Sequence, residues 1–135
     1  MPTIKNFEEL IIWQEARKIN IKVYSLTKKF PRAELFGLTS QIRRASVSIM
    51  SNIAEGFNRR SKKEFISYLI ISRGSLFEVQ SDLYTALDLN YISKEEFEEL
   101  YGHSEKIAMS INKLIKYLRL KIERYSVKND KYLNN

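Results

Sequence analysis

Hydrophobic residues recur along this 135-residue chain at the three- and four-residue steps of amphipathic α-helices, in four successive stretches. The first predicted helix spans residues 7–29 and the second spans residues 33–56. The third follows Ser61 and ends near Leu89, and the fourth follows Ser93. The first stretch illustrates the spacing, with one apolar face made of Ile12, Ala16, Ile19, Val23 and Leu26. No stretch alternates like a β-strand, so the pattern predicts an all-α protein.

Polar residues mark where these helices begin. Three pairs have the spacing of a capping box, in which two side chains satisfy free N–H groups at a helix start: Asn6 with Glu9, Ser61 with Glu64, and Ser93 with Glu96. Short connections between long helices place neighbours antiparallel, which predicts an up-down four-helix bundle over residues 1–126. Residues 127–135 lose the periodicity, and we expect them to form a flexible C-terminal tail.

The second predicted helix contains ten consecutive uncharged residues, 45–54, although 29% of the chain is charged. A surface helix normally keeps one charged face. Two explanations are open. In the first, the helix is crowded by its own bundle or simply exposes a serine-rich face; in the second, another face of the helix meets another copy of the chain. We favour the second copy, which predicts an oligomer interface at Val47, Ser48, Met50, Ser51, Asn52 and Glu55.

Small residues on the second and third helices suggest close packing. A mid-helix glycine costs ~1 kcal/mol relative to alanine, so we assign structural roles to Gly74 and to Gly56, which lies on the core face of its helix. Ser75 and Glu78 are assigned structural roles as well. A buried carboxylate needs a partner. If Glu78 or Glu55 is buried, the candidate partners are Ser75, Asn52 and Arg44; the alternative is that both carboxylates are solvated.

Charge is distributed unevenly about a net value of +7. Residues 17–73 hold thirteen basic and three acidic side chains. Residues 74–105 hold one basic and eight acidic side chains, and residues 106–135 hold eight basic and two acidic ones. Basic residues cluster near the predicted helix connections and indicate a polyanionic partner held through phosphate contacts. The candidate nucleic-acid-binding residues are Arg43, Arg44, Arg59, Arg60, Lys62 and Lys63, followed by Lys28, Lys29 and Arg32.

Composition excludes several other classes. The chain has no cysteine, which rules out disulfide scaffolds and thiolate chemistry. No uncharged apolar run approaches the ~18–20 residues that a membrane-spanning helix needs, and the first residues do not resemble a signal peptide, so we expect a cytoplasmic protein. His103 is the single histidine, and no phosphate-binding glycine motif is present. We therefore expect no enzymatic activity, no metal and no cofactor.

One segment carries a family resemblance. Residues 36–58, FGLTSQIRRASVSIMSNIAEGFN, resemble the signature of four-helix-bundle proteins encoded in intervening sequences of bacterial 23S rRNA genes, sometimes labelled S23 ribosomal proteins. The resemblance extends over residues 7–118. It implies a four-helix bundle that assembles into a ring-like homopentamer. The family also includes the accessory variability determinants of diversity-generating retroelements, basic pentamers that bind nucleic acid and a reverse transcriptase.

Pattern, charge and resemblance together favour a non-enzymatic, basic homo-oligomer that binds RNA or DNA through backbone phosphates. The alternative is a protein-interaction scaffold with no direct nucleic-acid role, in which the acidic and basic regions meet between subunits or on a protein partner.

Overall fold

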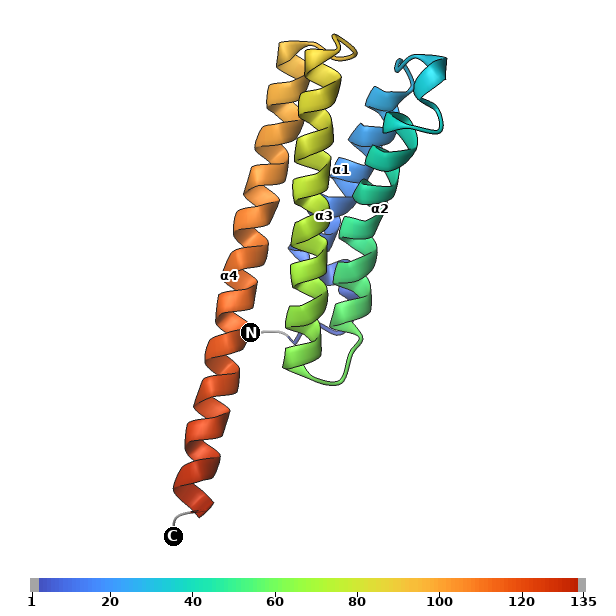
Figure 1. Cartoon of the computed structure of the whole chain (residues 1–135). Coiled ribbons are helices and arrows are strands. Elements are labelled where there is room, and N and C mark those ends of the chain that lie inside the picture. The colour runs from blue at the N-terminus through green and yellow to red at the C-terminus, as the bar shows by residue number, and fades with distance from the viewer. Residues whose placement is uncertain (1–2, 134–135) are drawn as a thin grey trace.

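The computed structural model describes residues 3–133, with side chains as far as residue 129. Within that range the chain forms two short 3₁₀ helices and four α-helices, with no strand: η1 (Phe7–Glu9), α1 (Ile11–Thr27), η2 (Arg32–Glu34), α2 (Leu38–Phe57), α3 (Lys62–Asp88) and α4 (Lys94–Leu133). Consecutive α-helices run antiparallel, and α4 is much the longest (Figure 1). The predicted all-α, four-helix architecture is confirmed.

The first two helices begin later than the sequence pattern predicts. The Asn6–Glu9 capping box is present, but it caps η1, and Leu10 is extended with φ −71° and ψ 124° before α1 begins. Residues 32–34 form a separate 3₁₀ turn, and Gly37, at φ −111° and ψ −114°, is the N-cap of α2, which begins at Leu38, five residues later than predicted. The side-chain caps at Ser61 and Ser93 form as predicted, each hydroxyl accepting an N–H at 3.1 Å.

The end of α4 differs most from the expectation. Residues 127–133 continue the helix, where the sequence pattern shows no periodicity and predicts a tail; residues 134–135 lie outside the described part of the chain. A helix that is already formed extends without a new nucleation cost, so this segment needs no packing partner to continue. Ile122 is the last α4 residue that packs on the core, and residues 123–129 are all exposed. The helix therefore continues past the end of the bundle (Figure 1).

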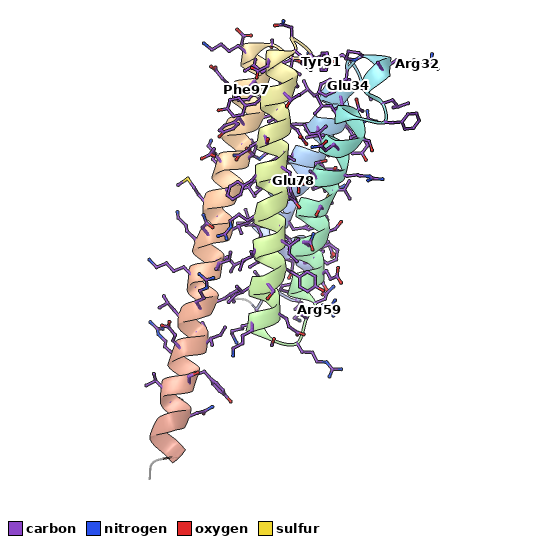
Figure 2. All side chains as sticks on the ribbon, viewed as in Figure 1. Arg32, Glu34, Arg59, Glu78, Tyr91 and Phe97 are labelled. Atoms are coloured by element: carbon purple, nitrogen blue, oxygen red, sulfur yellow. The ribbon has the colours of Figure 1, made fainter. Side chains whose placement is uncertain are left out.

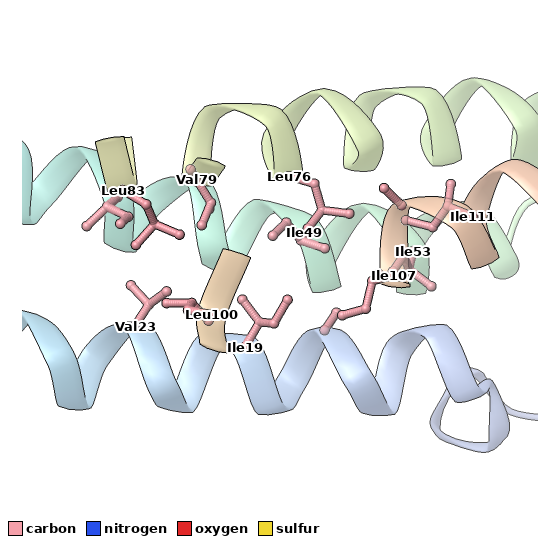
Figure 3. Close-up of a cluster of buried hydrophobic side chains, with 14 of the residues drawn as sticks. Ile19, Val23, Ile49, Ile53, Leu76, Val79, Leu83, Leu100, Ile107 and Ile111 are labelled. Atoms are coloured by element: carbon pink, nitrogen blue, oxygen red, sulfur yellow. The ribbon is translucent and has the colours of Figure 1, made fainter. Parts of the chain in front are cut away.

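All four α-helices contribute to one hydrophobic core (Figure 3). Its fully buried residues include Ile19 and Val23 of α1, Ile49 and Ile53 of α2, Leu76, Val79 and Leu83 of α3, and Ile111 of α4. Each such side chain contributes roughly 1.5–3 kcal/mol of burial free energy. No helix within the described residues is long and apolar enough to cross a bilayer.

The contact between α2 and α3 is unusually close. A Cβ placed on Gly56 would lie 2.6 Å from the Cβ of Tyr68, so only glycine fits there without a shift. The buried Ser72 hydroxyl donates to the Ile49 carbonyl at 2.7 Å, and Ser75 Oγ donates to Ser48 Oγ at 2.8 Å. Small residues thus bring the two backbones together inside one chain. Gly74 differs, because nothing lies within 4 Å of its Cβ position.

This close contact accounts for most of the uncharged stretch in α2. Of residues 45–54, four are buried and four are half-buried, and only Val47 and Ser51 are exposed. The stretch is covered by α3 on one side and α1 on the other, where Ser46 donates to Asn20 at 2.9 Å. Crowding within its own bundle explains the missing charges without a second copy. The predicted interface residues Ser48, Met50 and Asn52 are half-buried, whereas Glu55 is exposed.

The buried carboxylate is Asp82, which sequence reasoning did not single out; Glu55 and Glu78 are both exposed. Asp82 retains 5% of its surface, and Gln41 donates to its Oδ1 at 2.9 Å, but its Oδ2 has no hydrogen-bond partner. Burial, followed by repulsion from Glu78, raises the pKa of Asp82 to about 6. The ionised form is therefore unfavourable in the fold.

A pair of glycine substitutions tests the α2–α3 contact. Gly56→Ala should lower the free energy of unfolding by about 1–3 kcal/mol, because the added methyl group overlaps Tyr68. Gly74→Ala is the matched control, and it should leave stability unchanged or raise it by up to about 1 kcal/mol through helix propensity. Urea unfolding followed by circular dichroism measures both. Equal effects at the two sites would contradict this account.

Asp82 makes stability depend on pH. The folded protein binds the Asp82 proton more tightly than the unfolded chain, so this group's contribution is complete below about pH 4 and is lost as pH rises through about 6. Asp82→Asn should remove that loss. It should raise stability at pH 7.5 by at most about 3 kcal/mol, with little gain at pH 4. Urea unfolding at the two pH values measures the difference; a pH-independent effect would contradict the assignment.

Candidate nucleic-acid interface

Three of the predicted phosphate-binding residues, Lys28, Lys29 and Arg32, lie at the end of the bundle where α1 joins α2. The connection between α3 and α4 lies at the same end, with Phe30 and Tyr91 5.5 Å apart between ring centroids (Figure 2). Lys29 forms an ion pair with Glu96, and the hydrogen bond from Lys29 lowers the pKa of that carboxyl. The acidic start of α4 therefore offsets the basic charge at this end.

Arg43 is held by its own chain. Its Nε donates to Thr27 Oγ1 at 2.8 Å, and its guanidinium lies 4.8 Å from the centre of the Tyr24 ring. Thr27 is buried and Arg43 half-buried, so this arginine joins α2 to α1. Its guanidinium is committed to internal contacts, which leaves it poorly suited to phosphate.

Arg44, the next residue along α2, has different surroundings. It is exposed and forms no ion pair among the described side chains. It lines an open hollow of about 460 Å³ between α2 and α3, together with Gln41, Ser48 and Glu78. The Glu78 carboxylate in the same hollow makes this an unfavourable place for a lone phosphate.

Arg59 lies at the opposite end of the bundle from Arg32 (Figure 2), where it closes a small network. It donates to Glu55 Oε1 at 2.7 Å and to the Tyr68 hydroxyl at 2.6 Å, and Tyr68 donates to the same carboxylate at 3.3 Å. The hydrogen bond to Glu55 raises the pKa of the guanidinium, which stays charged in any case. Glu55 thus has a partner within the chain.

Arg60, Lys62 and Lys63 follow directly, in the connection from α2 to α3 and the first turn of α3. All three are exposed, and none has an ion-pair partner among the described residues. They lie at the end of the bundle away from the acidic start of α4 (Figure 1). Of the nine predicted residues, these three are the best placed to meet phosphate.

The same end contains basic residues that the candidate set omits. Arg73 Nη1 donates to Asn112 Oδ1 at 2.8 Å, which fixes the register between α3 and α4. Counting from that contact, the start of α3 lies beside α4 near residue 122, so the basic second half of α4 flanks Lys62 and Lys63. The excess of positive charge after residue 106 is visible in the sequence. Its position beside the α2–α3 connection could not be predicted, because it depends on how α3 and α4 pack against each other.

A groove of about 700 Å³ lies between α1 and α4 and contains His103. Its Nε2 lies 2.7 Å from Glu15 Oε2 and its Nδ1 lies 3.3 Å from Lys22 Nζ. The ring therefore links the two helices, and its hydrogen bond is the main cause of the lowered pKa of Glu15. Within the described residues, no three histidine or carboxylate side chains group as metal ligands would.

Comparisons with known proteins agree with this architecture. A crystal structure at 1.70 Å of a protein of unknown function from the S23 ribosomal protein family of Bacteroides thetaiotaomicron has the same fold, with a TM-score of 0.74. The two chains are 24% identical over 78% of this chain and 99% of that one. No curated protein matches. The family model for the 23S rRNA-intervening sequence protein matches residues 8–127, nearly the whole chain. This protein belongs to the 23S rRNA-intervening sequence protein family.

Proposed function

We propose that this protein binds nucleic acid through backbone phosphates, as a non-enzymatic basic homo-oligomer. The observation that carries the proposal is the segregation of charge in the bundle. Arg60, Lys62 and Lys63 are exposed at one end without an ion-pair partner among the described residues, whereas at the other end Lys29 and Lys22 pair with carboxylates of α4. Exposed basic side chains without an ion-pair partner attract the phosphate backbone, and the backbone releases its counterions when they bind.

The arrangement of these residues favours contact with phosphate over reading of bases. No aromatic residue in this connection is fully exposed; Phe57 packs edge-on against Phe65 with ring centroids 6.0 Å apart. The side chains available are therefore point charges. They confer affinity without sequence preference, and a homo-oligomer would multiply the effect by presenting the same end several times.

The first test is the salt dependence of binding. Titrations of labelled duplex DNA and RNA should show log K falling linearly with log[salt]. In Arg60→Gln/Lys62→Gln/Lys63→Gln the slope for duplex DNA should be shallower by about 2–3 units, at ~0.9 per lost contact. Lys5→Gln/Arg17→Gln/Lys18→Gln removes the same charges elsewhere on the surface and should bind like the wild type. Affinity that does not depend on salt would reject the proposal.

Self-association is tested separately by light scattering. Ser51 is the exposed polar residue within the uncharged stretch, and its hydroxyl bonds only to the Val47 carbonyl of its own helix. If this face lies between copies, Ser51→Lys should lower the molar mass, because it places a charge in the contact. Ser25→Lys, on the exposed side of α1, should not. A monomeric wild type would contradict the oligomer.

A scaffold that binds another protein is the second candidate, and one surface favours it. Phe36, between η2 and α2, is 94% exposed, and Leu35 beside it is 47% exposed. With Tyr24, Val47 and Arg43 they line a hollow of about 380 Å³. Exposed aromatic and arginine side chains around a hollow are typical of protein interfaces. Protein partners captured from nuclease-treated lysate, and lost with Phe36→Ser, would favour the scaffold.

A further inference from the structure

The second half of α4 carries an unusual outward face. Counting 100° per residue from the buried Ile111, six of the seven basic residues between 106 and 129 fall within an arc of about 140° opposite the core, and the seventh, Arg119, lies outside that arc. The six are Lys106, Lys113, Lys116, Lys121, Arg124 and Lys128. All six are exposed, and none takes part in an ion pair among the described residues. We call this set the α4 stripe. Glu123, the one acidic residue between 106 and 129, lies outside the arc.

The α4 stripe is straight and long. From Lys106 to Lys128 it spans 22 helical steps, or about 33 Å at 1.5 Å per residue. That length is close to one turn of duplex DNA, about 34 Å. A rigid row of charges matches a rigid duplex better than a flexible single strand, which proteins hold chiefly by stacking bases on aromatic rings. On this face the Tyr117 ring instead packs against Lys121, whose Nζ lies 5.5 Å from the ring centre.

The α4 stripe also reaches the bases already described. The end of the bundle that α4 passes is the end where α2 joins α3 (Figure 1), so the connection that carries Arg60, Lys62 and Lys63 lies level with the C-terminal half of α4. These two groups come from segments about fifty residues apart in the sequence. Both groups therefore place basic side chains at the same end of the molecule.

We propose that the α4 stripe is the principal contact of this protein with nucleic acid, holding the phosphate backbone of a duplex along about one turn. This inference rests on the proposed function and names its main site. The connection between α2 and α3 supplies the remaining contacts at the end of the bundle.

Charge selects this partner over two others. A second copy of the same segment would be repelled, because residues 106–129 hold seven basic side chains and one acidic side chain. Insertion into a membrane surface would require a continuous apolar face, but on this side of α4 the aliphatic residues are sparse: Met109, Leu120 and Val127. Bases flank each of them. A polyanion with regularly spaced charges fits the stripe best.

The experiment compares two variants of the full chain, each with four basic side chains replaced by glutamine. The stripe variant is Lys113→Gln/Lys116→Gln/Arg124→Gln/Lys128→Gln. The control variant, Lys5→Gln/Arg17→Gln/Lys18→Gln/Lys94→Gln, loses the same three lysines and one arginine at exposed positions elsewhere. Glutamine matches lysine in helix propensity, so the helix should persist, which circular dichroism checks.

Binding to a 20-base-pair duplex over a salt series should show the stripe variant at least tenfold weaker near 0.1 M salt. Its slope of log K against log[salt] should be about 3–4 units shallower than that of the wild type, and the control should change by less than one unit. Replacing the three lysines by arginine and Arg124 by lysine should restore the slope. Equal slopes in the stripe variant and the wild type would overturn the inference and leave binding at the α2–α3 connection intact.

Other outcomes distinguish failure of the proposed function from failure of the proposed site. A wild type that binds neither DNA nor RNA rejects the proposed function, and the inference with it. A single strand of the same length bound as tightly as the duplex overturns the duplex assignment. If the wild type binds phosphatidylglycerol vesicles more tightly than it binds the duplex, and the stripe variant does not bind them, the stripe is a membrane contact. A changed molar mass in the stripe variant would identify it as a contact between copies.

Discussion

The close approach of α2 and α3 is the constraint from which the rest of the molecule follows. Gly56 removes the Cβ that would collide with Tyr68, and the Ser72 hydroxyl donates to a carbonyl of the facing helix rather than to its own. Hydroxyls in this contact satisfy one another at a spacing that larger side chains would prevent. Because the contact extends over most of α2, packing within one chain accounts for much of the uncharged stretch.

That contact also decides where charge is presented. It fixes α2 and α3 antiparallel, so the connection between them emerges at one end with Arg60, Lys62 and Lys63, and the acidic start of α4 is directed to the other end. There Glu96 pairs with Lys29 and Glu99 with Lys22, at 3.4 Å for the second pair. Net charge alone hides this arrangement. The fold converts alternating charged segments of the sequence into a nearly neutral end and a basic end.

Much of the fold could be predicted from the sequence, because helix periodicity and capping boxes are local signals. Ser61 and Ser93 start their helices where the spacing predicts. The roles of the arginines could not be predicted, since they depend on neighbours from other helices. Arg43 meets Tyr24 and Thr27 of α1, and nothing in the local sequence distinguishes it from Arg44. The burial of Asp82 also depends on tertiary contacts, because Gln41 of α2 covers one oxygen. The helical end of α4 was missed because its exposed residues lack periodicity, a signal that reports burial rather than helix formation.

Membership of the family establishes the fold but assigns no activity to this chain. The function of the protein therefore has to be inferred from its charged side chains and their partners. An arginine that stacks on its own tyrosine contributes stability, whereas a lysine with no neighbour remains available to a ligand. By that criterion the available charge lies chiefly in the α2–α3 connection and along the second half of α4. In the signature segment Arg43 is committed to its own chain, and Arg44 shares a hollow with Glu78. The signature residues build the bundle. Binding of a polyanion is then a property of what the bundle leaves unpaired at one end.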